Sequence, residues 1–126
     1  MFLKNLKKFF SLWIPVIFWC GIIFFFSSIP DLKIIELGLL DLILRKIAHI
    51  TEFGILAILF FRAFSETIKN NVSFWSGFSS FVYAITDEFH QLYVPGRGPS
   101  PVDVLIDTFG IFFALLILKY VRKKQN

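Results

Sequence analysis

Eight side chains that could carry chemistry stand among apolar residues between positions 49 and 107. An imidazole titrates near neutral pH and can act as a general base, while a buried carboxyl can keep its proton and act as an acid. A guanidinium can bind a phosphate or a developing oxyanion. The candidates for catalysis are His49, Glu52, Asp87 and Glu88, and the candidates for binding are Gln91, Arg97, Asp103 and Asp107.

The spacing of these residues places each polar set on one face of a helix, because residues three and four apart are neighbours on a helix surface. Glu52 could orient His49 as a base, and Arg97 could pair with carboxylates below it. Gly110 would let two helices approach closely. The pairs with helical spacing are His49–Glu52, Asp87–Gln91, Glu88–Gln91, Asp103–Asp107 and Asp107–Gly110.

Carboxylates and imidazoles also ligate divalent metals, so the sequence admits a metal site. The residues that would hold the metal are Glu52, Asp87, Asp103 and His49. No other cofactor is evident.

Four apolar runs must position these side chains. Each has about 20 residues, the length that crosses a hydrocarbon core of about 30 Å as a helix. The runs lack strand-like alternation, and only closed hydrogen-bonding structures are stable in lipid. We therefore expect an all-α membrane protein, one domain over residues 1–126, with about four transmembrane helices in a small bundle. The expected helices are 9–28, 43–64, 72–93 and 102–121.

Composition supports lipid as the solvent. Of the 126 residues, 56% are hydrophobic, 18 are Phe and only 17% are charged. A soluble domain of this size would need far more polar surface. The net charge of +4 lies in basic residues that bracket the apolar runs, so we expect no nucleic-acid partner. The single Cys20 excludes an internal disulfide.

The distribution of Lys and Arg predicts the orientation. With the N-terminus in the cytoplasm, nine of the 13 lie inside and four outside, so both termini are expected to be cytoplasmic in a multi-pass cell-membrane protein. The polar residues then fall about 15 to 26 Å above the inner boundary, in the outer half of the membrane. On the outer side, residues 30–42 are expected to form an interfacial or re-entrant segment. Residues 95–101 are expected to form a tight turn, with Ser100 as a helix N-cap.

Three sequence elements resemble the VanZ-like family of membrane proteins. His49-Ile50-Thr51-Glu52-Phe53 is similar to its HxxEF element, and Thr86 to Gln91 is similar to its TDExxQ element. Pro95-Gly96-Arg97, followed by Asp103 and Gly110, resembles the third element, in which Asp107 takes the place of the usual Asn. The resemblance implies a bacterial cell-envelope protein. The family is named for a protein associated with low-level resistance to the lipoglycopeptide teicoplanin, and most members have no assigned activity.

Three readings of the polar cluster stay open at the level of sequence. It could be a structural network of ion pairs without chemistry. It could be the site of an enzyme, acid–base or metal-assisted, acting on a phospholipid or a wall precursor at the outer interface. It could bind or carry a lipid head group, a lipid-linked wall precursor or a glycopeptide.

Overall fold

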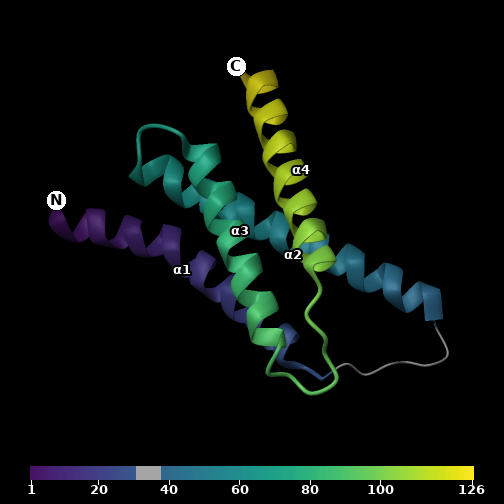
Figure 1. The fold of residues 1–126 in the computed structure, drawn as a ribbon. Coiled ribbons are helices and arrows are strands. Elements are labelled where there is room, and N and C mark those ends of the chain that lie inside the picture. The colour runs from purple at the N-terminus through teal and green to yellow at the C-terminus, as the bar shows by residue number, and fades with distance from the viewer. Residues whose placement is uncertain (31–37) are drawn as a thin grey trace.

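The protein is a bundle of four α-helices, described here from a computed structural model of residues 1–30 and 38–126. Figure 1 shows the helices crossing one another, with both chain termini and the α2–α3 turn toward one end and the α3–α4 turn toward the other. The all-α fold expected from the sequence is confirmed. The helices are α1 (Phe2–Ser28), α2 (Gly38–Thr67), α3 (Val72–Gln91) and α4 (Pro101–Gln125).

The helix boundaries follow local sequence chemistry. Asn71 adopts a left-handed conformation with φ of 58° between α2 and α3, which Asn tolerates better than most residues. In the next turn, Gly96 takes a φ of 78°, where a side chain would be strained. Pro101 then occupies the first position of α4, where its missing N–H costs nothing.

Two of the helices begin at least five positions earlier than expected. The first helix begins seven positions earlier than predicted, at Phe2, because its amphipathic basic start continues the helix beyond the apolar run. The second begins at Gly38, so residues 38–42 of the predicted interfacial or re-entrant segment are helical and continue into α2. The rest of the predicted interfacial segment, residues 31–37, lies outside the described residues.

Three of the four helices, α1, α2 and α4, are long and apolar enough to cross a membrane. The third, α3, buries a line of small and polar residues, including Ser76, Ser80 and Asp87, against its neighbours. Large apolar side chains cover the outside of all four helices, and Phe18, Phe25 and Phe89 are each more than 60% exposed. Such a surface suits hydrocarbon and would aggregate in water.

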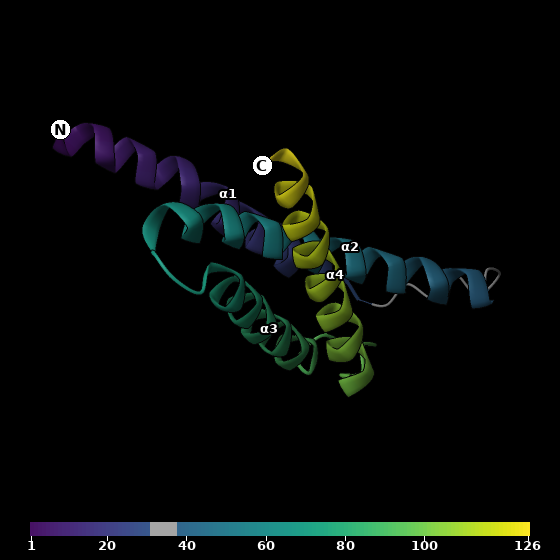
Figure 2. The same ribbon diagram turned by 90° about the horizontal axis from the view of Figure 1, so that it is seen from above.

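The closest approach within the bundle is the crossing of α2 and α4, which Figure 2 shows from above. A Cβ atom added to Gly110 would lie 2.5 Å from the backbone oxygen of Ile50. A Cβ atom on Gly54 would lie 3.4 Å from the backbone oxygen of Gly110. The close contact expected at Gly110 is therefore present, and it lies one helical turn from Asp107.

Two hydrogen bonds join α1 to the other helices near its middle. The indole Nε1 of Trp19 donates to the backbone oxygen of Glu52 at 2.8 Å, and the hydroxyl of Tyr83 donates to the backbone oxygen of Cys20 at 2.6 Å. Ile23 of α1 and Phe53 of α2 are also fully buried. These contacts hold α1 against α2 and α3 and so close one side of the polar region described next.

Candidate functional site

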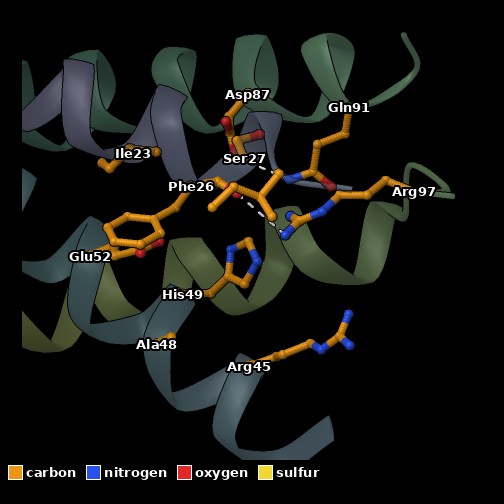
Figure 3. Close-up of a pocket in the computed structure, with 11 residues that line it drawn as sticks. Ile23, Phe26, Ser27, Arg45, Ala48, His49, Glu52, Asp87, Gln91 and Arg97 are labelled. Carbon is orange, nitrogen blue, oxygen red and sulfur yellow. Dashed lines mark hydrogen bonds between the residues drawn. The ribbon is translucent and has the colours of Figure 1, made fainter. Parts of the chain in front are cut away.

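A polar cavity of about 220 Å³, here named the first cavity, lies between α1, α2, α3 and the α3–α4 turn. Figure 3 shows Asp87 and Gln91 of α3 across from His49 of α2, with Arg97 extending between them, while Arg45 of α2 points away from His49. Apolar residues of α1 close the remaining side. The side chains around the cavity are Ile23, Phe26, Ser27, Ile29, Arg45, Ala48, His49, Glu52, Asp87, Gln91 and Arg97.

A second cavity of about 140 Å³ adjoins the first and shares Arg45, His49, Gln91 and Arg97 with it. Its other polar residues are Lys46 and Asp103, which form an ion pair. The structure therefore brings six of the eight predicted residues, from α2, α3, α4 and the turn, to the walls of two joined cavities. His49, Glu52, Asp87, Gln91 and Arg97 line the first cavity, and Asp103 lines the second.

His49 is held by Asp107, on the facing helix. Its Nδ1 lies 3.1 Å from Oδ1 of Asp107, whose side chain is fully buried. The expectation that Glu52 would orient His49 is wrong. The α2–α4 crossing at Gly110 brings Asp107 within reach of the imidazole, while Glu52 lines the first cavity and forms no side-chain hydrogen bond within the described residues. A carboxylate on Nδ1 fixes the ring and leaves Nε2 for a ligand.

Asp87 and Gln91 are joined along α3, as their spacing predicts. The Gln91 amide Nε2 donates to Oδ2 of Asp87 at 3.3 Å, and both side chains are buried. The other carboxylate oxygen, Oδ1, has no hydrogen-bond partner within the described chain. A buried oxygen of this kind is costly to leave unmet, and the Ser27 hydroxyl, which also lacks a hydrogen-bond partner in the described chain, lies beside Asp87 in Figure 3.

Glu88 belongs to a different environment from Asp87. Its Oε2 accepts the backbone N–H of Ser100 at 2.8 Å, across the α3–α4 turn, and it lines neither polar cavity. Ser100 is the N-cap of α4 as predicted, but its side chain makes no capping bond. Glu88 thus fixes the start of α4, and the structure does not place it with the other predicted catalytic residues.

Arg97 lies between the two cavities and contacts a helix end. Its Nη2 donates to the backbone oxygen of Phe26 at 3.3 Å, where the last carbonyls of α1 lack partners within the helix. Among the residues that the structure describes, no carboxylate forms an ion pair with Arg97, and its Nε has no partner. The predicted pairing with carboxylates is therefore wrong in this structure, because the Phe26 carbonyl takes its place.

The four residues suggested as metal ligands are divided among separate contacts. Asp103 pairs with Lys46, and His49 with Asp107. Over residues 1–30 and 38–126, no three His, Cys, Asp or Glu side chains are grouped closely enough to ligate a metal ion. A metal remains a prediction of the sequence alone.

Several site residues were missed by reasoning from the sequence. Arg45 and Lys46 entered the prediction only as two of the four basic residues on the outer side, although they precede His49 by four and three positions and share its helix face. His90 also has a partner, because its Nε2 lies 2.9 Å from the Ser28 hydroxyl and its ring stacks on Phe24 at 4.2 Å. The α1 residues gave no signal, since an apolar run does not show which face meets a cavity.

Fold and site together define a small helical membrane protein with charged side chains gathered inside the bundle. The model of the VanZ/LLP1 family matches residues 10–122, nearly the whole chain, and the protein belongs to that family. No curated protein and no solved structure matches the chain.

Proposed function

We propose that this protein binds the phosphate-bearing head group of a lipid-linked component of the bacterial envelope. The observation that carries the proposal is Arg97. This guanidinium faces both cavities, has a free Nε and is joined at the second cavity by Arg45 and Lys46. Guanidinium groups bind phosphate in a planar, bidentate manner, and their attraction is strongest where water is excluded.

The dimensions of the site favour a compact head group. The first cavity, at about 220 Å³, is smaller than the roughly 300 Å³ at which pockets for drug-sized ligands begin. An intact glycopeptide is much larger. A head group inside the cavities, with its acyl chains along the apolar helix surfaces, matches both the polar interior and the Phe-rich exterior.

The proposal includes an orientation. We infer four crossings, both termini in the cytoplasm and the cavities in the outer leaflet, because nine of the 13 Lys and Arg residues then lie inside. The similar placement of the two termini in Figure 1 supports an even number of crossings. Although α3 is less apolar than the other helices, its polar side is buried against them.

Binding of a short-chain phospholipid to the purified full chain tests this function. We expect calorimetry in a non-ionic detergent to detect dihexanoyl phosphatidic acid, and Arg97→Gln to weaken that binding about tenfold or more, as for loss of a charge-assisted contact. The control is Arg122→Gln, which removes the same charge from an exposed residue stacked on Phe61. Equal affinity of the two variants, or no binding by the unaltered protein, would contradict the proposal.

The second candidate function is acid–base catalysis on the same class of lipid. It is favoured by the contact of 3.1 Å between His49 and Asp107, since a carboxylate behind an imidazole is the arrangement of a positioned general base. Lipid mass spectrometry of cells with and without the protein tests it. A lipid that changes in cells with the unaltered protein, and not with His49→Gln, supports catalysis. An unchanged lipid profile supports binding alone.

The family resemblance gives a cellular measurement for either function. If the bound lipid is a wall component, cells producing the protein should tolerate more teicoplanin than cells that lack it. Arg97→Gln should lose that protection while Arg122→Gln keeps it. If both variants protect the cells equally, teicoplanin tolerance does not depend on Arg97 or on the cavities that it lines.

A further inference from the structure

Carboxylates and cationic side chains are distributed unequally between the two joined cavities. The first cavity has the carboxylates Glu52 and Asp87 on its walls, and the second cavity has neither of them. The second has Lys46, whose partner Asp103 is the one carboxylate among the described residues that line it. Arg97 lies on the boundary. A ligand that fills both cavities therefore meets two carboxylates in the first cavity only, the guanidiniums of Arg45 and Arg97 in both, and mainly positive charge in the second.

Three polar atoms of the lining residues have no hydrogen-bond partner in the described part of the chain: the hydroxyl of Ser27 and one atom on each of two charged side chains. The latter two are Oδ1 of Asp87, on a side chain that is only 5% exposed, and Nε of Arg97. The first is an acceptor on a side chain that lines the first cavity beside Ser27, and the second is a donor on a side chain that lines both cavities, as Figure 3 shows. Buried polar atoms are nearly always satisfied in native proteins, so these two mark where a ligand supplies a donor and an acceptor.

From this arrangement we propose that the head group is zwitterionic. Its phosphate lies against Arg97, and a primary ammonium lies in the first cavity between Glu52 and Asp87. The ligand class is thus an aminoalkyl phosphate lipid. This inference rests on the proposed function and adds the cationic half of the ligand, which the binding of phosphate does not require.

A primary ammonium fits the first cavity better than a quaternary one. It carries three N–H donors, which two carboxylates can accept. A quaternary ammonium has none and is recognised instead by several aromatic faces. Phe26 is the single aromatic residue on the wall of the first cavity within the described residues, so an aromatic cage is missing there.

The test compares ligands on the unaltered protein, so it does not depend on any variant folding. The probes are dihexanoyl phosphatidylethanolamine, its N-acetyl derivative, which keeps the phosphate and loses the ammonium, and dihexanoyl phosphatidylcholine. Calorimetry on the full chain in detergent should show the first binding about tenfold or more tightly than the other two. Equal affinity of the first two probes would overturn the inference while leaving the proposed function standing. If none of these phosphate lipids binds, the proposed function itself has failed.

Variants of the two carboxylates test whether the ammonium lies in the first cavity. The double variant Glu52→Gln with Asp87→Asn should bind all three lipids within about threefold of one another, because the amides replace the charge and keep the shape. The matched control is Glu66→Gln, on the exposed carboxylate that pairs with Lys8 at the other end of the bundle, which should keep the preference. A preference that survives in the double variant would place the ammonium elsewhere and overturn the assignment.

One further arm separates a lipid from a free compound of the same chemistry. Soluble O-phosphoethanolamine has the same charged groups and no acyl chains. Weaker binding of this compound than of the dihexanoyl lipid supports a lipid ligand. Binding that is equally tight would assign the cavities to a free aminoalkyl phosphate and overturn the lipid part of the inference.

Discussion

At the scale of single residues, two buried carboxylates each have one oxygen in a hydrogen bond and one oxygen without a partner in the described chain. Asp107 bonds His49 through one oxygen, and Asp87 bonds Gln91 through one oxygen, while the second oxygen of each carboxylate has no partner among the described residues. A purely structural network would be expected to meet both oxygens, because half-satisfied polar groups inside a bundle are unfavourable. This asymmetry favours a ligand-binding role for Asp87, which faces the first cavity.

Asp107 allows a prediction about charge and stability. Asp107→Asn, which introduces the residue usual at this position of the family motif, should keep a hydrogen bond to His49 and leave the unfolding temperature unchanged or higher, because it removes a buried charge. Asp107→Ala leaves the imidazole without that partner and should cost about 1–3 kcal/mol. Thermal unfolding in detergent, followed by circular dichroism, measures both. An equal loss in the two variants would show that the carboxylate charge itself is needed.

At the scale of elements, the α2–α4 crossing determines which residues meet. The sequence predicted that polar residues share helix faces, and it predicted the close approach at Gly110. It could not predict that Asp107 would replace Glu52 as the partner of His49, because spacing within one helix says nothing about the register of the facing helix. Arg97 was misread for a related reason. Its partner is a backbone carbonyl of α1, which no side-chain pattern reveals.

Gly110→Ala tests the crossing. The added Cβ atom would lie 2.5 Å from the Ile50 backbone oxygen, so α2 and α4 must move apart, and we expect a loss of about 1–3 kcal/mol or failure to fold. Gly21→Ala is the matched control, since nothing lies within 4 Å of its added Cβ atom and alanine favours the helix. The unfolding temperatures of the two variants should therefore shift in opposite directions. A neutral Gly110→Ala variant would mean that the helices are farther apart than described.

At the scale of the whole molecule, the sequence predicted the fold class and four helices close to their observed positions, because hydrophobic length is a strong signal in lipid. The extension of α2 back to Gly38 was missed, since residues 38–42, which are apolar except for Gly38 and Asp41, were assigned to the interfacial segment instead of to the helix. The cavities were also beyond prediction. They arise from the way four helices cross, and the apolar side chains of α1 contribute to them as much as the charged ones do.

The inferred orientation is tested by labelling single cysteines in intact cells, with Cys20 replaced by Ser. Asn5→Cys and Gln125→Cys should resist a membrane-impermeant maleimide until the cells are opened. Gly98→Cys, in the exposed α3–α4 turn with open space around it, should react at once. Labelling of only one of the two termini from outside would imply an odd number of crossings and would contradict the four-span arrangement.

The bond from Ser100 to Glu88 spans 12 positions and ties the start of one helix to the last turn of the one before it. The connecting stretch, with Arg97 within it, therefore has a fixed length. Inserting or deleting a single residue there would either break that bond or swing the guanidinium out of the interior. Relatives that share this architecture should consequently vary freely in length at the opposite end of the bundle and hardly at all across this stretch, so that a gap in an alignment of the family at this point would mark a protein with a different ligand.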